Sequence, residues 1–390
     1  MSSWEAVPLA KVARLERAVI SPAEIRDDMT YVGLEHITGD GAFVGASSLH
    51  GRVIESAKFR FTEHHLLYGK LRPYLAKIAC PDFGGICSTD ILPVLTGPKL
   101  ERRFLFHFLR QPAMVAHATA RSTGANLPRL SPSVLETFEV PLPPLPEQYR
   151  IAKILDQAEM VRAKRRTALT QLDTFAQAIF LDLFGDQATN PKAWRQSELG
   201  DLIRSGPQNG LYKPANAYGS GTPILRIDAF YDGTVRDLSS LKRVRLSESE
   251  RSLFGLAQGD IVVNRVNSID YLGKSALIPE LSEPTVFESN MMRMSADPAA
   301  VEPGYLVQFL QSQFVRGQIL AASKNAVNQS SINQQDVKAL RVNVPPLPLQ
   351  QEFARHVAVV EKLKAAQRAS LAQLDALFAS LQYRAFRGEL

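Results

Sequence analysis

The sequence predicts an α/β protein with two globular mixed α/β domains, separated by two long antiparallel coiled-coil helices in a pseudo-two-fold internal repeat. Three observations support this prediction. A proline-rich motif occurs twice, an uninterrupted helical pattern follows each copy, and a mixed pattern of strands and helices precedes each copy. The predicted boundaries are 1–142 for the first domain, 143–187 for the first helix, 188–344 for the second domain and 345–390 for the second helix.

The repeat is the strongest internal signal. Residues 143–148 read PPLPEQ and residues 345–350 read PPLPLQ, an offset of 202 residues that continues without a gap over about sixty residues. Trp4 and Trp194, the only tryptophans, match at an offset of 190, so the second unit holds about a dozen additional residues. A period this long indicates duplicated domains and not a solenoid.

The first domain contains strand-like runs at 31–34 and 91–94 and a helical pattern at 101–110. A basic segment with two tyrosines, 68–77, lies in its middle, and a second polar segment, 121–126, lies shortly before the proline motif. Arginine, lysine, asparagine and serine side chains are the ones that reach phosphates and base edges of DNA. A solvated loop has the same composition, and for each loop alone that interpretation is the more frequent one.

A helical pattern without internal proline or glycine runs from Pro146 to Gly185. Proline suits the first turn of a helix and glycine suits its end. At 1.5 Å per residue this helix would be roughly 58 Å long. A helix of that length with one apolar stripe needs a partner, and the matching helix in 345–390 is the obvious one. The alternative is that each helix packs only on its own domain.

Apolar residues recur every three or four positions along both helices, with polar Arg165 and Gln367 at equivalent central steps. We predict that the helices pair through this stripe. The predicted seam residues are Leu155, Val161, Leu169, Leu172, Ile179, Val357, Leu363, Leu371, Leu374 and Leu381.

The second domain contains strand-like runs at 261–263 and 291–294 and a helical pattern at 305–319. Its basic segment is 264–274 and its late polar segment is 324–331. Because similar segments recur at similar places in both copies, DNA contact is favoured more strongly than for any one loop. The candidate DNA-binding residues are Lys70, Arg72, Tyr74, Lys77, Arg121, Ser122, Asn126, Arg265, Asn267, Tyr271, Lys274, Lys324, Asn325 and Asn328.

Motifs of catalytic or nucleotide-binding sites are missing from the sequence. Gly273-Lys274 hints at a phosphate loop, but Ser268 stands where that loop requires glycine. The Asn-Pro-Pro-aromatic motif of adenine methyltransferases is absent, as are GxGxxG, HExxH and GxSxG. His64 and His65 would point to opposite faces of a strand, which argues against a shared metal. We therefore expect a non-catalytic chain that binds no cofactor or metal of its own.

Composition is that of a globular protein, with 45% apolar and 22% charged residues. The net charge of +6 permits nucleic-acid binding without showing it. Cys80 and Cys87 are spaced too widely for a CxxC redox pair or a zinc site, so we expect reduced thiols. No run of eighteen apolar residues and no secretory signal pattern occurs, so we expect a cytoplasmic protein without a membrane span.

These features resemble the specificity subunits of type I restriction-modification systems, over the whole chain. The most specific match is VPLPPLPEQYRIAKILD at 140–156 together with its copy at 344–360. Weaker matches are the opening tryptophan with a downstream leucine (repeated at Trp194), YVGLEHI at 31–37, LLYGKLRPYLAKIA at 66–79, GGICSTDILPV at 84–94, GDIVVNRV at 259–266 and LGKSALI at 272–278.

The resemblance implies that each globular domain is a target-recognition domain that reads one half of a split, asymmetric site on double-stranded DNA. It implies that the antiparallel helices set the gap between the half-sites and dock two methyltransferase subunits, which bind S-adenosylmethionine and methylate adenine. Restriction and translocase subunits that use ATP and Mg²⁺ would join them to cut unmodified DNA in phage defence. The chain departs from the repeat at Leu349, where the first copy has Glu147.

Three other functions remain open from the sequence. One is a specificity subunit of a methyltransferase-only or other phage-defence system, which the neighbouring genes would distinguish. Another is a two-domain protein-binding adaptor on a coiled-coil stalk, which would lack salt-dependent DNA affinity. The third is an enzyme with an unrecognised site, which would show turnover as an isolated chain.

Overall fold

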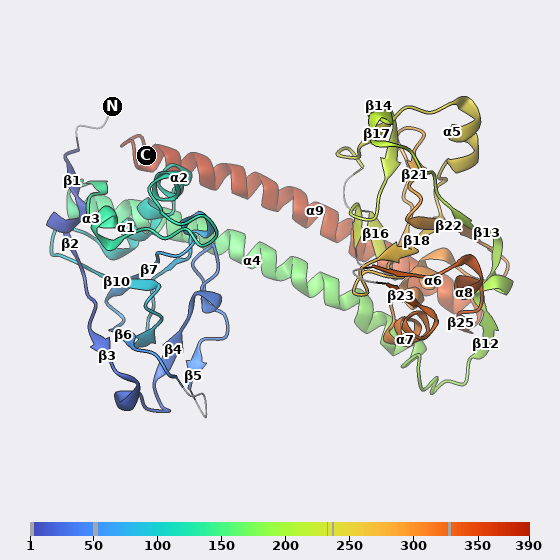
Figure 1. The fold of residues 1–390 in the computed structure, drawn as a ribbon, viewed down its shortest axis with the longest axis horizontal. Coiled ribbons are helices and arrows are strands. Elements are labelled where there is room, and N and C mark those ends of the chain that lie inside the picture. Colours follow the sequence, from blue (N-terminus) through green and yellow to red (C-terminus); the bar gives the residue numbers. More distant parts are fainter. Residues whose placement is uncertain (1–3, 50–53, 232, 236–237, 327–328) are drawn as a thin grey trace. The chain divides into compact units, whose positions relative to one another are not determined.

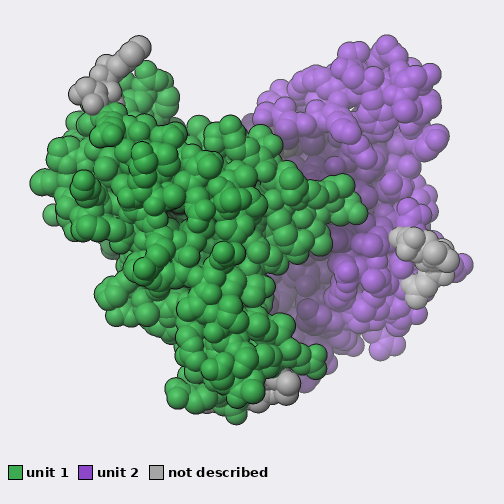
Figure 2. Space-filling model, turned by 60° about the vertical axis from the view of Figure 1, so that its left-hand side comes forward, with its two compact units in different colours: residues 1–167, 369–390 green, residues 168–368 purple. Residues whose placement is uncertain are grey.

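The computed structural model describes residues 4–49, 54–231, 233–235, 238–326 and 329–390. Along the chain, a group of strands and short helices is followed by a long helix, and the same order then occurs a second time (Figure 1). The chain forms two compact units (Figure 2): unit 1 is 1–167 with 369–390, and unit 2 is 168–368. Each long helix thus contributes residues to both units.

The described part of unit 1 contains three sheets, with the strand orders β1-β11, β2-β10-β7-β8 and β3-β6-β9-β4-β5. Short helices accompany the sheets. The bounds are β1 Ala6–Pro8, β2 Ala13–Leu15, β3 Val19–Ile20, β4 Thr30–Val32, β5 Ser47–Ser48, β6 Lys58–Phe61, β7 His65–Gly69, β8 Ile78–Ala79, β9 Gly85–Cys87, β10 Ile91–Thr96, β11 Glu139–Pro141, α1 Arg102–Leu109, α2 Pro112–Ala120 and α3 Pro132–Glu136.

Unit 2 has four sheets among its described residues, with the strand orders β12-β25, β13-β22-β18-β20-β16-β15, β17-β14-β21 and β19-β24-β23. Its strands are β12 Arg195–Glu198, β13 Ile203–Asn209, β14 Tyr218–Leu225, β15 Phe230–Tyr231, β16 Gly233–Val235, β17 Arg243–Val244, β18 Asp260–Asn264, β19 Val266–Asn267, β20 Ser275–Leu277, β21 Val286–Phe287, β22 Met291–Ala296, β23 Lys324–Ala326, β24 Gln329–Ser331 and β25 Arg341–Val344. Its short helices are α5 Glu248–Phe254, α6 Pro303–Leu310, α7 Gln313–Ala322 and α8 Gln334–Lys338.

The predicted α/β class with two long helices is confirmed, and most of the predicted strands are found. The runs at 91–94, 261–263 and 291–294 lie in β10, β18 and β22. The run at 31–34 is only partly a strand, because β4 ends at Val32 and a 3₁₀ turn follows. The single helix predicted at 305–319 is wrong: Ser312 caps a new helix, α7, so the chain turns between α6 and α7.

The proline-rich motif has the same structural role in both copies. Its last residue, Gln148 or Gln350, is fully buried at the first turn of the long helix. The Gln148 Nε2 donates to the carbonyl of Pro143 at 2.8 Å, and its Oε1 accepts from the N–H of Glu101 at 2.8 Å. Gln350 makes the matching contacts at 2.7 and 2.9 Å. The glutamine therefore fastens each long helix to the start of the domain helix α1 or α6, which explains why the motif recurs.

The two long helices are α4, Leu145–Phe184, and α9, Leu347–Ala385. As predicted, α4 stops at Gly185, whose φ of 76° is the left-handed conformation that glycine adopts at helix ends. Among the described residues, neither helix has the length and apolarity needed to cross a membrane.

Within each unit the helices run antiparallel. In unit 1 the start of α4 (Leu155) and the end of α9 (Phe378) lie in one hydrophobic core. In unit 2 the end of α4 (Phe184) and the start of α9 (Phe353) share the other core, with their rings 5.4 Å apart. The alternative in which each helix packs only on the domain that precedes it is therefore excluded.

Matched ion pairs fix the helix register. In unit 1, Arg162 of α4 pairs with Asp375 of α9 at 2.6 Å. In unit 2, Lys364 of α9 pairs with Asp173 of α4 at 2.8 Å. Each cation also pairs with a glutamate one turn earlier on its own helix, and each is largely shielded from solvent. We call each of these two interhelical ion pairs a clamp. Arg162 corresponds to Lys364 and Asp173 to Asp375 at the 202-residue offset, so each unit contains the same ion pair.

The predicted seam residues lie in the hydrophobic cores toward the helix ends, and two of them are exposed. Leu155, Ile179, Val357 and Leu381 lie in or against the two cores. The more central Leu169, Leu172, Leu371 and Leu374 are half-buried. Val161 and Leu363 are instead 43% and 47% exposed, because the neighbouring Arg162 and Lys364 point toward the partner helix and take their place.

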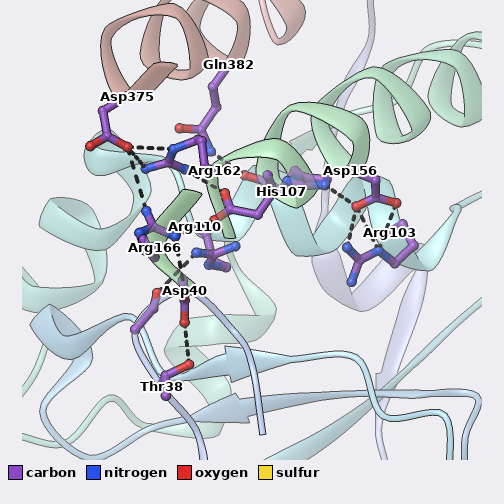
Figure 3. Close-up of polar contacts among 12 residues, drawn as sticks. Thr38, Asp40, Arg103, His107, Arg110, Asp156, Arg162, Arg166, Asp375 and Gln382 are labelled. Carbon is purple, nitrogen blue, oxygen red and sulfur yellow. Dashed lines mark hydrogen bonds and ion pairs between the residues drawn. The ribbon is translucent and has the colours of Figure 1, made fainter. Parts of the chain in front are cut away.

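A polar network joins α1 to the long helices in unit 1 (Figure 3). Asp156 of α4 accepts from Nε2 of the fully buried His107 at 2.7 Å and from Arg103. Burial alone would raise the pKa of Asp156, but hydrogen bonds from His107 and Arg103 lower it to about 2. Burial lowers the pKa of His107 and keeps its ring neutral. Because both pKa values are lower in the folded state, unit 1 should lose stability as pH falls below about 6.5 and again below about 4.

Replacing Asp156 by alanine should destabilise unit 1 by about 1–3 kcal/mol, since His107 and Arg103 would lose their shared acceptor. Hydrogen exchange of the α1 amides at neutral pH measures this effect. Asp182→Ala removes an exposed aspartate from the same helix and should cost less than about 0.5 kcal/mol. Equal exchange of α1 in the two variants would contradict the role of the network.

Candidate nucleic-acid interface

The two polar segments predicted in the first domain lie side by side in unit 1. The segment 68–77 begins in β7, and the N–H of Arg72 donates to the carbonyl of Pro128 at 2.7 Å. Leu71 forms an isolated β-bridge with Arg129. The late segment reaches this place through Thr123, which also bridges to Arg129, so backbone about fifty residues apart in sequence lies together at the end of β7.

The exposed candidates of unit 1 are Arg72, Tyr74, Arg121 and Asn126. Tyr74, 50% exposed, stands on a 3₁₀ turn flanked by two residues in left-handed conformation, Arg72 (φ 51°) and Ala76 (φ 48°). Such a conformation costs non-glycine residues about 1 kcal/mol or more and tends to occur at functional sites. The turn thus holds an arginine and a tyrosine outward at fixed positions.

Other candidates of unit 1 are engaged inside the protein. Lys77 donates to the carbonyl of Leu34 at 2.6 Å, and Ser122 donates to the last turn of α2 at 2.7 Å. Lys70 lies 3.9 Å from Asp90. These three side chains support the loops, and each is partly exposed, that of Lys70 to 22%.

Arg129 joins this surface although it was not predicted from the sequence. Its Nε donates to Asp90 at 3.2 Å, and its side chain is 47% exposed. Asp90 therefore lies between two cations, Lys70 and Arg129. The position of Arg129, three residues after the predicted segment, was the available signal, and a longer segment would have included it.

The two polar segments of the second domain also meet. Strand β19 pairs with β24, with Val266 opposite Ser331 and Asn267 opposite Ser330. The N–H of Ile332 donates to the carbonyl of Arg265 at 3.0 Å. In each unit, the segment that follows β7 or β18 therefore lies beside the segment that precedes α3 or α8.

The candidates of unit 2 differ in their surroundings. Tyr271 is 41% exposed, and the ammonium of Lys274 lies 4.4 Å from the centre of its ring. Lys324 is exposed at the start of β23. The side-chain Oδ1 of Asn267 accepts a hydrogen bond from the backbone N–H of Ser268 at 2.8 Å. Asn325 is placed only through its backbone pairing in β23, and Asn328 lies outside the described residues.

A cavity of about 330 Å³ surrounds the last candidate of unit 2, Arg265. Its other lining residues are Asn209, Asn333, Gln334 and Gln335, none of which was predicted from the sequence. The run Asn-Gln-Gln directly after the late polar segment was a usable signal, whereas nothing in the sequence marked Asn209.

The two units use one backbone frame for this region. Lys70 donates its N–H to the carbonyl of Asp90 at 2.9 Å, and Arg265 donates to Asn290 at 2.8 Å. The carbonyl of Lys70 accepts the N–H of Leu130 at 2.9 Å, and that of Arg265 accepts the N–H of Ile332 at 3.0 Å, in both cases just after the late polar segment. Equivalent positions thus carry a charged cluster in unit 1 and an arginine among amides in unit 2.

Comparison with known families gives one match across most of the chain. The profile of the type I restriction modification DNA specificity domain matches residues 1–171 and 191–375. The specificity subunit of the type I restriction enzyme EcoKI from Escherichia coli is 28% identical over 328 residues, which cover 79% of this chain and 69% of that protein. The EcoDI specificity subunit, also from Escherichia coli, is 28% identical over 210 residues, or 52% of this chain and 45% of that protein.

Solved structures share the fold. The type I restriction-modification S subunit from M. genitalium superposes with a TM-score of 0.61 at 12% identity and covers 98% of this chain and 96% of its own. A chain from a study of complex assembly and conformational transition of the type I R-M system gives a TM-score of 0.55 at 21% identity, with 99% and 98% covered.

Proposed function

The chain belongs to the family of type I restriction-modification DNA specificity subunits, and we propose that its two units read the two halves of a bipartite, asymmetric DNA site. The observation that carries this proposal is the meeting of two polar segments in each unit on a shared backbone frame with different side chains. A common frame with different side chains suits two readers of one fold that recognise different bases.

In this proposal the chain itself is not catalytic. It positions adenine methyltransferase subunits, which bind S-adenosylmethionine, and nuclease or translocase subunits, which use ATP and Mg²⁺. Affinity for DNA would come mainly from phosphate contacts and specificity from a few base contacts in each unit. The family match favours this function over a methyltransferase-only system or a protein-binding adaptor.

Exposed apolar side chains on the long helices support docking of two identical subunits. Unit 1 exposes Val161, Leu377 and Tyr383, at 43%, 53% and 60%. Unit 2 exposes Leu363, Phe175 and Leu181, at 47%, 55% and 47%. These six residues form three pairs at the 202-residue offset, whereas the exposed Tyr149, Met160 and Val359 of the same helices have polar counterparts. Single exposed apolar residues are common on protein surfaces, but a duplicated set suits one partner that binds twice.

Replacing Phe175 and Leu377 together by aspartate should weaken the binding of methyltransferase subunits at least tenfold, because each position would bring a charge into an apolar contact. Co-purification of the partner subunits measures this effect, and DNA binding by the chain alone should stay unchanged. The matched control is Gln171→Asp with Gln373→Asp, two exposed polar positions at the same offset. Equal loss in the control would contradict an apolar docking site.

Sequencing of methylated adenines in the native host, with and without this gene, tests the proposed function. We expect one bipartite motif to lose all of its methylation when the gene is deleted and to regain it on complementation. An unchanged methylation pattern would refute the proposal.

A further inference from the structure

The cavity around Arg265 in unit 2 has the chemistry of a base-reading site. We infer that it recognises the edge of a guanine in the half-site that this domain reads. The inference rests on the proposed function, since it assigns one base contact within the polar surface described above.

Three separate parts of unit 2 build this cavity. Asn209 ends β13, Arg265 follows β18, and Asn333, Gln334 and Gln335 begin α8. Asn333 is held in place, because its Oδ1 caps α8 by accepting the backbone N–H groups of Gln335 at 2.7 Å and of the next residue at 3.1 Å. The cavity therefore has walls fixed by secondary structure and not by a long loop.

The guanidinium of Arg265 is held in place, but not all of its N–H donors are paired. Its Nη1 donates to the carbonyl of Ser289 at 3.1 Å, which orients the guanidinium. Its Nε is buried without an acceptor among the residues that the structure describes. Buried donors are normally paired, so the unpaired Nε leaves the guanidinium with unused hydrogen-bonding capacity beside the cavity that Arg265 lines.

The lining favours a base edge over a phosphate. Among the lining residues that the structure describes, Arg265 carries a charge and Asn209, Asn333, Gln334 and Gln335 are neutral amides. Phosphate oxygens only accept hydrogen bonds, so the lining amide oxygens other than Oδ1 of Asn333, which the helix backbone already pairs, would gain no donor from a phosphate. The major-groove edge of a G·C pair offers the O6 and N7 acceptors of guanine, which match the planar guanidinium of arginine, and the N4 amino donor of cytosine, which suits an amide oxygen.

The equivalent position in unit 1 carries different chemistry. Lys70 occupies the place of Arg265, lies near the carboxylate of Asp90, and shares that carboxylate with Arg129. Asn290 takes the place of Asp90 in unit 2. The same backbone arrangement thus holds an arginine that can pair with guanine in unit 2 and a cluster of paired charges in unit 1. The guanine preference should therefore belong to one half-site only.

The test compares methylomes of the full complex in cells that carry Arg265→Gln, Arg265→Lys or the wild-type chain. We expect Arg265→Gln to relax the motif at one G·C pair in one half-site, from about tenfold preference or more to less than about twofold, because glutamine does not pair with O6 and N7 as arginine does. Arg265→Lys should retain part of that preference, because lysine contacts the same two atoms. Asn209→Ala, at an exposed lining residue, should disturb the same half-site. Arg195→Gln removes an exposed arginine from β12 and should leave the motif unchanged.

The outcomes separate the possibilities. A motif that stays intact in Arg265→Gln, or one that is methylated less in both variants without relaxing at any base pair, indicates a phosphate or structural role and overturns the inference. If the Arg265 variants lose all methylation through misfolding, Asn209→Ala decides, and an intact motif in that variant overturns the inference. A wild-type gene whose deletion alters no motif refutes the proposed function instead.

Discussion

Exchanging residues 1–142 for the first domain of a subunit that reads another sequence should replace one half of the methylated DNA site and leave the other half intact. The polar segments of unit 1, 68–77 and 121–126, lie inside the exchanged part, and those of unit 2 lie outside it. Each altered base pair costs about 1–3 kcal/mol, so several together should reduce methylation of the old sites at least a thousandfold.

The structure shows what the graft must retain. On α1, the rings of Phe104 and Phe108 pack 5.1 and 5.5 Å from Phe386, and the carbonyl of His107 accepts from Gln382 of α9 at 3.1 Å. A graft that keeps the Phe104 and Phe108 side chains should methylate its new motif, and one with both replaced by alanine should not. Methylated-adenine sequencing distinguishes these results. A change in both halves of the site would show that the units do not read independently.

The sequence predicted the parts of the fold that depend on periodicity and repetition. The α4 and α9 helices followed from their stripes and from Gly185, and the domain duplication followed from the repeated motif. The division of 305–319 into two helices was missed because the break is a serine cap, whereas the equivalent break between α1 and α2 has Pro112.

The seam shows where helical periodicity stops being informative. An apolar stripe places Val161 and Leu363 inside the helix pair, yet Arg162 and Lys364 take those positions. Long basic side chains can lay their methylene stems along a partner helix while they pair with a carboxylate, and a hydrophobic pattern does not register this. The repeat did contain the signal, because the clamp residues of the two helices match at the same offset.

The candidate interface was predictable as segments but not as individual side chains. Sequence composition located both polar segments of each unit, and the structure joins them. Composition could not separate exposed Arg72 from Lys77, which is bound to a backbone carbonyl. It also could not find Asn209, because that residue comes from a strand about fifty-six positions before Arg265 and reaches the cavity only through tertiary structure.

Inserting four residues into both long helices, after Thr167 and after Arg368, should lengthen the preferred gap between the half-sites by one or two base pairs. Four residues add roughly 6 Å of rise and about 40° of rotation to a helix. The rise corresponds to about two base pairs of B-DNA and the rotation to about one. Both half-site sequences should stay the same, so the methylome would show the old motif with a longer gap and no methylation at the original spacing.

The clamps make the matched insertion the informative one. Arg162 and Asp173 are eleven residues apart on α4, and Lys364 and Asp375 are eleven residues apart on α9, so one antiparallel register satisfies both ion pairs. An insertion in α4 alone makes the two spacings unequal. One of the two ion pairs must then break, together with the packing around it. We therefore expect the single insertion to reduce methylation at every spacing and the matched insertion to restore it at the new one. If the matched insertion kept the original gap, the paired helices would not set the distance between the half-sites.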